Sequence, residues 1–519
     1  MMDLNLYEIE KATGGKLVLQ GADGEKQVSG VVLDSRKVEE GCVFLATIGE
    51  RVDGHKFIGD VFAKGASLVI SQKTPEQVEE ELGVSASAWG SYLLVEDSFQ
   101  ALKEIAEYYR CKLTIPVVGI TGSVGKTSTK EFVAGVLAEK YEVLKTEGNF
   151  NNEVGLPLTL LRIRPHHQVA VVEMGISDFG EMHRLSKMAR PNICVITNIG
   201  QCHLESLKTR DGILQAKTEM FDFMAEDAKI CLNGDDDKLR TVTEVKGRKP
   251  YYFGLDGNNK DVYADTIVSK GLFGSDAVLH IKTDMGERQD KVRPKDEVLP
   301  KVTDGINHNA EVADGPKCTV DVVGDKEHMD DVAIHCPLSG IHMVINATAA
   351  ACVAKLLGLD IEQIREGISH VSAIGGRNNL IPLSRYTVID DCYNANPVSM
   401  KAAIDLLAMA DTTKIAILGD MFELGDNSDD LHADVGAYAV ENGIDRIYCV
   451  GENSKHMYDS AVRNIKDSQT TKVYYFANRE ELLHTLEQEA DAYLPQGCTV
   501  LVKASHGMQF AEVVEWLKK

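Results

Sequence analysis

The chain has 519 residues, of which 44% are hydrophobic and 26% charged, so its composition is that of a globular protein with about three domains. Its formal net charge of -24 argues against a nucleic-acid or membrane-surface partner, because both are polyanions. The sequence shows no apolar run of the roughly 18 residues that a spanning helix needs, no signal-peptide pattern and no Cys-x-x-Cys pair, which predicts a reduced cytoplasmic protein without membrane insertion.

Residues 1–111 are predicted to form a small α/β domain. Short apolar runs at 28–38, 41–49, 65–72 and 91–97 are separated by turn residues and favour strands. The stretch from Ser98 to Arg110 favours a helix that precedes the predicted boundary near Cys111.

Residues 112–374 are predicted to form a central domain. A strand over Thr114–Ile120 leads through a glycine-rich turn into a helix over Lys126–Lys140, and further strands are expected at Val169–Gly175 and Asn192–Gly200. Because these strands are continuously apolar and alternate with helices, we expect a parallel sheet buried on both faces. The segment 282–331 is acidic and poor in apolar residues, and is predicted to be a solvated insertion.

Residues 375–519 restart the alternation of strands and helices. Apolar runs at 386–391, 414–420, 446–451, 472–476 and 499–505 predict strands, and helices are expected at Met400–Ala410 and Leu431–Asn442. This pattern indicates an open, doubly wound, Rossmann-like domain. The fold class is therefore α/β in three domains, the central one built on a phosphate loop.

The strongest local motif is GITGSVGKTSTK at 119–130. Gly122, Ser123 and Gly125 let backbone N–H groups approach phosphate oxygens, while Lys126 reaches the β and γ phosphates. The Thr127 hydroxyl is suited to ligate Mg²⁺, and the following helix adds its positive N-terminal end. Although Ile120 stands where the strict Walker A pattern requires glycine, the order of strand, turn and helix predicts binding of ATP.

Polar residues follow the next two predicted strands. Glu173 ends one of them, and Asn198 and His203 follow the other, at the edge where parallel sheets bind ligands. Each has a structural alternative: Glu173 as a helix cap or ion-pair partner, His203 as a structural histidine, and Lys217 as a solvated helical lysine.

Several motifs in order resemble the Mur ligase family. They are TGSVGKT at 121–127, NFNNEVG at 149–155, EMG at 173–175, NIGQCHLE at 198–205 and AKTE at 216–219. In the third domain, DDCYNANPVSM at 390–400 and LGDMFELG at 418–425, followed by His432, resemble the members that add a dipeptide. DSR at 34–36 and VDGHKFI at 52–58 are similar to that family's UDP-sugar domain, here residues 1–111.

The resemblance implies roles for individual residues. Lys126, His203 and Lys217 are expected to be catalytic, with Lys217 at the position of a carbamylated lysine. Thr127, Glu173, His203 and Lys217 are expected at Mg²⁺ sites. The nucleotide contacts implied are Gly122, Ser123, Gly125, Lys126, Thr127, Ser128, Asn346, Arg377, Asp391 and Tyr393. The substrate contacts implied are Ser35, Arg36, Asn149, Asn151, Asn152, Asn394 and Asn396. Turn chemistry is an equal alternative for the Asn-Ala-Asn-Pro loop.

The implied activity is ATP-dependent ligation of D-alanyl-D-alanine to a UDP-N-acetylmuramoyl-tripeptide through an acyl phosphate, by a monomer with Mg²⁺. A sister ligase that adds one amino acid, a non-enzymatic nucleotide switch and a motor-type ATPase remain as alternatives. Near the C-terminus, VKASHGM at 502–508 departs from the family's Lys-Gly-Ser-Arg segment. Ala504 replaces the glycine and His506 the arginine, so only Lys503 and Ser505 are carried over.

Overall fold

The computed structural model describes residues 2–49, 52–285, 301–302, 328–372, 375–377, 379–466 and 470–519. These residues separate into two compact units. The first comprises Met1–Thr121, Lys140–Val195 and Ala216–Ala228, and the second comprises Gly122–Glu139, Ile196–Gln215 and Lys229–Lys519. The predicted domain boundaries near residues 111 and 374 stay predictions. Within the described residues, no helix combines the length and apolarity needed to cross a membrane.

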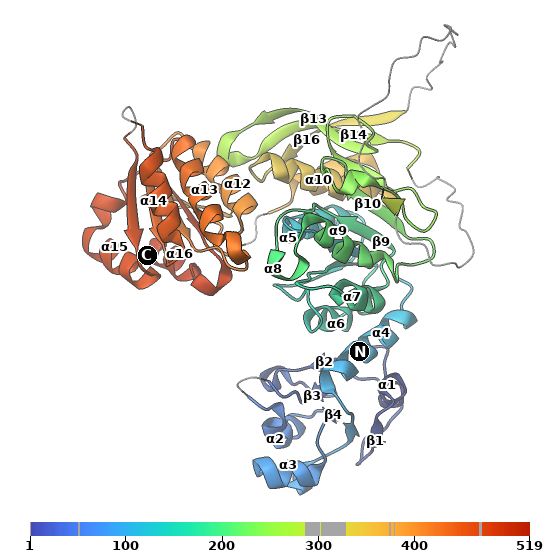
Figure 1. Ribbon diagram of the computed structural model, residues 1–519. Helices are drawn as coiled ribbons and strands as arrows, with labels where there is room; N and C mark the ends of the chain where they lie inside the picture. The colour runs from blue at the N-terminus through green and yellow to red at the C-terminus, as the bar shows by residue number, and fades with distance from the viewer. Residues whose placement is uncertain are drawn as a thin grey trace, which may run out of the picture. The chain divides into compact units, whose positions relative to one another are not determined.

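The N-terminal region is a five-stranded sheet in the order β1-β5-β4-β3-β2 (Figure 1). β2 to β5 pair in parallel, as continuous apolar runs predict, whereas β1 pairs antiparallel with β5 and was not predicted. The helix expected at 98–110 is confirmed, with Asp97 capping its first turn. The elements are α1 (Leu6–Thr13), β1 (Lys16–Val18), β2 (Val31–Val32), β3 (Val43–Leu45), α2 (Ile58–Ala63), β4 (Leu68–Ser71), α3 (Pro75–Leu82), β5 (Tyr92–Leu94) and α4 (Ser98–Lys112).

The central region is built on a nine-stranded sheet in the order β16-β14-β13-β12-β10-β9-β6-β8-β7. In the first unit, β7, β8 and β6 pair in parallel. β6 and β8 are buried, as predicted, whereas β7 is only partly buried. The elements up to β9 are β6 (Val117–Thr121), α5 (Lys126–Leu137), β7 (Val143–Lys145), α6 (Gly155–Leu160), β8 (Val169–Glu173), α7 (Glu181–Ala189) and β9 (Ile193–Ile196). They are followed by α8 (Leu204–Leu207) and α9 (Arg210–Thr218).

The second unit contains an antiparallel part that the sequence did not predict. β10, β12 and β13 pair in parallel, and β13, β14 and β16 pair antiparallel. The elements are β10 (Lys229–Asn233), β11 (Val242–Glu244), β12 (Tyr251–Leu255), β13 (Val262–Ser269), β14 (Ser275–Lys282), β15 (Lys301–Val302), β16 (Met329–Cys336), α10 (Ile341–Leu356) and α11 (Ile361–Ser369).

The insertion predicted at about 282–331 stays a prediction, and its first and last residues lie in strands. Lys282 ends β14 and pairs with Met329 of β16, so both ends of the segment belong to the sheet. The reason is that β14 alternates buried and half-buried residues, which suits a strand with one covered face. Residues 286–300 and 303–327 of the predicted insertion lie outside the described residues.

The C-terminal region is a six-stranded sheet in the order β17-β18-β22-β19-β20-β21, parallel except for β17, which confirms the doubly wound prediction. Alternate residues of its strands enter two cores, one with α12, α13 and α14 and one with α15 and α16 (Figure 1). The elements are β17 (Asn379–Pro382), β18 (Thr387–Asp390), α12 (Pro397–Ala408), β19 (Lys414–Gly419), α13 (Ser428–Glu441), β20 (Arg446–Val450), α14 (Ser454–Asn464), β21 (Lys472–Phe476), α15 (Arg479–Tyr493), β22 (Thr499–Lys503) and α16 (Ala511–Leu517).

Two helices begin three residues earlier than predicted. α12 begins at Pro397 rather than Met400, because the Asn396 side chain caps it and proline is favourable at its first position. α13 begins at Ser428 rather than Leu431, with Asp429 and Asp430 in its first turn, where carboxylates are favourable.

Candidate active site

The predicted phosphate loop lies between the end of β6 and the start of α5. Gly125 has a φ of 81° and occupies the position before the first residue of α5, which is Lys126. A Cβ on Gly122 would lie 1.9 Å from Thr197 Oγ1, so only glycine fits there. The early N–H groups of α5 lack partners within the helix, as at every helix N-terminus, and are suited to phosphate oxygens.

The loop is braced by the segment that follows β9. Asn198 Oδ1 accepts a hydrogen bond from Val124 N at 2.9 Å, and Asn198 Nδ2 donates to Val124 O at 3.0 Å. Ser123 N donates to Asn198 O at 3.1 Å, and Thr197 Oγ1 donates to Val124 O at 2.7 Å. Gly200 N donates to Ser123 Oγ at 2.9 Å. The loop is therefore held by backbone-directed hydrogen bonds at two consecutive residues.

Lys126 lies over its own loop, with Nζ 2.7 Å from Gly122 O. Its ammonium group is thus already at the turn where phosphates are expected. On the same helix, Thr129 Oγ1 donates to Asn346 Oδ1 at 2.8 Å, which places the predicted nucleotide contact Asn346 of α10 beside α5. Thr127 is buried and Ser128 is half-buried in the first turn.

In the first unit, the side chain of Glu173 at the end of β8 is 2% exposed. Its Oε1 accepts a hydrogen bond from Asn151 Nδ2 at 2.9 Å. The neighbouring Asn152 uses its Oδ1 to accept from Val154 N and Gly155 N, so it starts α6, while Asn149 is exposed in the preceding turn. The structure brings Glu173 and Asn151 together and gives Asn152 a local structural task.

Lys217 is only 1% exposed at the end of α9, so the alternative of a solvated helical lysine is wrong. A buried ammonium group is costly unless it is paired or chemically neutralised. His203 precedes α8 with a φ of 49°, a left-handed conformation that is uncommon for a residue with a Cβ.

The loop between β18 and α12 carries the predicted third-domain contacts. Lys503, at the end of β22 and 2% exposed, has its Nζ 2.6 Å from Asp391 Oδ2 and 3.0 Å from Asn394 O. Asn396 Oδ1 accepts from Ser399 N at 2.9 Å and caps α12, the turn chemistry that the sequence left open.

Arg377 and His506 lie beside the Tyr393 ring, one as a cation over the ring and one as a ring tilted by 45° to it. The Arg377 guanidinium carbon lies 4.2 Å from the centre of the Tyr393 ring, and the His506 ring centre lies 5.4 Å from that of Tyr393. His506 and Arg377 therefore both lie against Tyr393. Ser505 Oγ accepts from Phe422 N at 2.9 Å, which links β22 to the loop after β19.

In the N-terminal region, Ser35 and Arg36 form a single 3₁₀ turn after Asp34. The Arg36 side chain is 87% exposed and donates hydrogen bonds to both oxygens of Asp34. These hydrogen bonds hold the pKa of Asp34 well below its usual range. Arg36 is accordingly a solvent-facing cation, the type of group that recognises phosphates.

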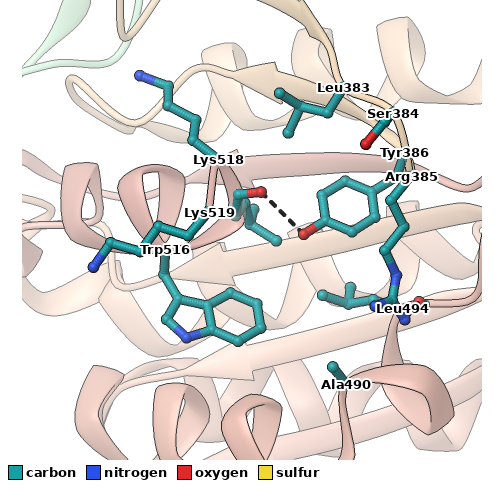
Figure 2. Close-up of a pocket in the computed structure, with 10 residues that line it drawn as sticks. Leu383, Ser384, Arg385, Tyr386, Ala490, Leu494, Trp516, Lys518 and Lys519 are labelled. Carbon is teal, nitrogen blue, oxygen red and sulfur yellow. Dashed lines mark hydrogen bonds between the residues drawn. The ribbon is translucent and has the colours of Figure 1, made fainter.

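A surface pocket of about 420 Å³ lies in the C-terminal region and contains none of the predicted site residues (Figure 2). There Tyr386 Oη donates to Leu517 O at 3.0 Å. Its position does not coincide with the polar strand ends where the ligand chemistry is expected. The pocket is lined by Leu383, Ser384, Arg385, Tyr386, Ala490, Leu494, Trp516, Leu517, Lys518 and Lys519.

The sequence did not predict the residues that hold the phosphate loop and the segment beside it. Asn198 was noted only as a residue at a strand end, although it holds the phosphate loop. Asn233, the last residue of β10, and Asp236, in the turn after it, were not singled out, although they contact Thr197 and Ile199. The run Asn-Gly-Asp-Asp-Asp after an apolar strand was the available signal, because clustered side-chain acceptors there bind backbone N–H groups.

The sequence matches three parts of one family. Residues 27–110 match the Mur ligase family catalytic domain, residues 120–354 the Mur ligase middle domain, and residues 376–506 the Mur ligase glutamate ligase domain. Two relatives bear the name UDP-N-acetylmuramoyl-tripeptide--D-alanyl-D-alanine ligase. The one from Bacillus subtilis (strain 168) is 31% identical, covering 94% of this chain and 93% of its own. The one from Escherichia coli (strain K12) is 30% identical, covering 100% and 99%.

Solved structures agree with these matches. A crystal structure of MurF from Acinetobacter baumannii superposes with a TM-score of 0.78 at 28% identity, covering 99% of both chains. MurF ligase from Thermotoga maritima in complex with ADP superposes with a TM-score of 0.71 at 26% identity, covering 94% of this chain and 97% of that one. This chain therefore belongs to the Mur ligase family.

Proposed function

We propose that the chain joins D-alanyl-D-alanine to UDP-N-acetylmuramoyl-tripeptide, using ATP, to form a UDP-N-acetylmuramoyl-pentapeptide. The observation that carries this proposal is the phosphate loop braced by Asn198, with Lys126 already at the turn, in a chain whose full-length relatives bear this activity in their name. The motor-type ATPase and the non-enzymatic switch are less favoured. The reason is that the chain has, in addition to the phosphate loop, the buried polar side chains of Glu173 and Lys217.

The proposed first step transfers the γ-phosphoryl group of ATP to the tripeptide carboxylate. A carboxylate oxygen attacks phosphorus, the bond to the β-γ bridging oxygen breaks, and ADP and an acyl phosphate result. Charge spreads over the equatorial oxygens, where the Lys126 ammonium group and the N-terminal end of α5 stabilise it. For this the Lys126 side chain exchanges its contact with Gly122 O for a phosphate oxygen.

The proposed second step forms the peptide bond. The neutral amine of the dipeptide attacks the acyl carbon, and a tetrahedral intermediate forms. The nitrogen loses one proton, and phosphate leaves with the bonding electrons of the broken C–O bond and takes up that proton. Because an acyl phosphate also hydrolyses, the reaction requires a site from which water is excluded. The loop from Asp391 to Asn396, held by Lys503, is the proposed third-domain contribution to nucleotide and dipeptide contacts, together with Arg377 and Tyr393.

The side chains fit Mg²⁺. The Thr127 hydroxyl and the buried Glu173 carboxylate are hard oxygen donors, and Mg²⁺ is bound by one or two carboxylates plus substrate phosphates rather than by an all-protein cage. Across the described part of the chain, no group of three or more His, Cys, Asp or Glu side chains is arranged to hold a metal ion. When bound, Mg²⁺ would neutralise phosphate charge; His203 and Lys217 are the proposed residues of a second site.

Lys217 is proposed to be carbamylated. Its neutral Nζ adds to carbon dioxide and loses a proton, which converts a cation into a carboxylate-like anion. Burial at 1% exposure supports the proposal, because the lysine is not the solvated surface residue that its sequence context favours and a carbamate supplies the anionic oxygens that a cationic site needs.

The decisive experiment measures phosphate release from ATP and Mg²⁺ by the full chain, with UDP-N-acetylmuramoyl-tripeptide and with or without D-alanyl-D-alanine. We expect release to require both substrates and the product to be heavier by the dipeptide. Release with a single amino acid instead would assign the chain to a sister ligase, and no release with either would contradict the ligase proposal.

A second experiment tests the carbamate. Lys217→Ala is expected to abolish ligation, and short carboxylates such as acetate are expected to restore part of it by supplying the missing anion. Lys187→Ala, on the exposed face of α7, is the matched control and is expected to keep activity. Full activity of Lys217→Ala without any additive would contradict the assignment.

We further propose that Ser35 and Arg36 bind the UDP part of the substrate, that residues 1–111, 112–374 and 375–519 are the functional domains, and that the enzyme acts as a cytoplasmic monomer. The acidic composition supports the last point, since a net charge of -24 favours mutual repulsion of copies. Light scattering of the full chain with and without substrates tests the oligomeric state.

A further inference from the structure

The last residue of β10 and the turn that follows it bind the main chain on both sides of Asn198 in the sequence. Asn233 Nδ2 donates to Thr197 O at 2.9 Å, one residue before Asn198. Asp236 Oδ2 accepts from Ile199 N at 2.8 Å, one residue after it. Asn198 is thus fixed between two hydrogen bonds that come from a neighbouring strand end rather than from its own loop.

The carboxylate of Asp236 is fully engaged by backbone donors. Besides Ile199 N, it accepts from Lys238 N and Leu239 N, both at 2.9 Å and both to Oδ1. Its side chain is 8% exposed, and Arg210 lies 4.0 Å away. Charge-assisted hydrogen bonds from backbone N–H groups are strong and directional in such a setting, so this carboxylate locks the position of Ile199 relative to the turn.

Arg210 adds a third tie to the same segment. Its Nε donates to Ile199 O at 2.8 Å, while its other nitrogens form an ion pair with Asp237. Both the N–H and the C=O of Ile199 are therefore held by charged side chains, and the peptide unit next to Asn198 has little freedom to rotate.

We infer that Asp236 is a positioning residue for nucleotide binding, which acts through Asn198 on the phosphate loop. The path is continuous: Asp236 holds Ile199, which keeps Asn198 in place, and Asn198 binds both the N–H and the C=O of Val124. Val124 lies between the two glycines of the loop. This inference rests on the proposed function, since it assumes that the loop binds the phosphates of ATP.

Asp236→Asn tests the inference with almost no change in size. The amide keeps one carbonyl oxygen, which remains on Lys238 N and Leu239 N, and turns its NH₂ group toward Ile199 N. Two donors then face each other, and a buried donor left unsatisfied costs enough to weaken binding about tenfold. We expect the Kd for ADP with Mg²⁺, measured calorimetrically on the full chain, to rise by that factor.

Asp235→Asn is the matched control in the same turn. Asp235 accepts from Leu255 N at 2.7 Å and pairs with Lys260 at 2.9 Å, and both of these partners lie outside the segment 197–200. We expect the variant to lower the melting temperature but to leave the Kd for ADP within about twofold of the original. A merely structural role for Asp236 predicts the same behaviour from both variants: a smaller active fraction, hence a lower kcat, with an unchanged Kd.

The path through Asn198 is tested by a double-mutant cycle. If Asp236 acts through Asn198, then Asp236→Asn adds less than about twofold to the Kd of an Asn198→Ala variant. If the factors by which the two substitutions raise the Kd multiply in the double variant, the proposed path is overturned. An unchanged Kd in Asp236→Asn would overturn the positioning role. If the unmodified chain itself fails to bind ADP, the proposed function fails instead, so the two failures are distinguished.

Discussion

The phosphate loop after β6 and the loop between β18 and α12 both follow the end of a parallel strand, and each carries predicted nucleotide contacts. The first is braced through backbone atoms: Asn198 binds the main chain of Val124, and Gly122 leaves no room for a Cβ. The second is braced through side chains, with Lys503 paired to Asp391 and Arg377 stacked on Tyr393.

The difference has a physical consequence. A loop fixed through its main chain tolerates substitution of side chains that point away from it. It does not tolerate a substitution that adds atoms where the main chain is closely packed. A loop fixed by a charged pair depends on the chemical identity of two side chains and on their protonation. Four substitutions, given in order of decreasing expected effect, test this difference between the two loops.

Lys503→Met removes the cation that holds the second loop. Asp391, a largely buried carboxylate, would then lose the ammonium group of Lys503, which costs about 3 kcal/mol in the free energy of unfolding. Urea unfolding of the full chain in a Trp89→Phe background measures this loss, because Trp516, in α16, is then the sole tryptophan and reports on the C-terminal sheet.

The control for this variant is Lys455→Met, which removes an exposed lysine paired with Asp459 in the same region. Its expected loss is within about 0.5 kcal/mol. Equal losses in the two variants would contradict the bracing role of Lys503.

Gly122→Ala places a methyl group where the first loop has no space. Its Cβ would lie 1.9 Å from Thr197 Oγ1, and moving that hydroxyl breaks its hydrogen bond to Val124 O. A displacement of about 1 Å at a phosphate site costs on the order of 100-fold in kcat/KM, or about 2.7 kcal/mol. Steady-state kinetics with varied ATP measure the effect.

Gly83→Ala separates this steric effect from backbone strain alone. Gly83 has a φ of 71°, and no atom lies within 4 Å of the position that an added methyl group would take, so the change strains the backbone without a collision. We expect a small loss of stability and unchanged kcat/KM; a comparable loss of kcat/KM would show that the space at Gly122 is not what matters.

His432→Gln removes a protonation-dependent brace near the second loop. His432 Nε2 accepts from Met421 N at 2.9 Å and Nδ1 donates to Ser428 O at 2.7 Å, and burial lowers the pKa of His432. The unfolded chain therefore binds a proton more readily, so stability falls as pH drops below about 6.5, by at most about 1.4 kcal/mol per pH unit. Urea unfolding between pH 8 and pH 5 should show a shallower decline in the variant.

The exposed His484 of α15 gives the control, since His484→Gln should leave the decline with pH unchanged. A decline that is identical in His432→Gln and in the original chain would mean that other groups cause it.

Arg377→Lys keeps the positive charge beside Tyr393 but loses the planar stack. A cation over an aromatic ring at a partly exposed site contributes about 0.5–1 kcal/mol, so the KM for ATP should rise roughly two- to fivefold. Arg385→Lys, at the pocket of Figure 2, is the control and should leave the KM unchanged. An unaltered KM in Arg377→Lys would remove the stack from the nucleotide site.

Much of the fold was predictable because its signals are local. Continuous apolar runs between helices indicated buried parallel strands, and they are found at β6, β8, β18, β19, β20 and β22. The pairing of β14 with β16 was not predicted, because its partners lie on opposite sides of the acidic segment and alternation alone does not identify them. Helix starts were missed where a cap such as Asn396 decides them.

The phosphate loop was predictable from the sequence alone, because glycines, a lysine and a helix start within a few residues indicate a turn whose N–H groups are suited to an anion. It also indicated Glu173 and Lys217 as chemical candidates through the order of the family's motifs. The contacts of Asp236 with Ile199 and of Lys503 with Asp391, and the burial of Lys217, depend on the tertiary structure. These contacts join residues far apart in the chain, and their energy depends on exclusion of water and on partner geometry, neither of which a local pattern encodes.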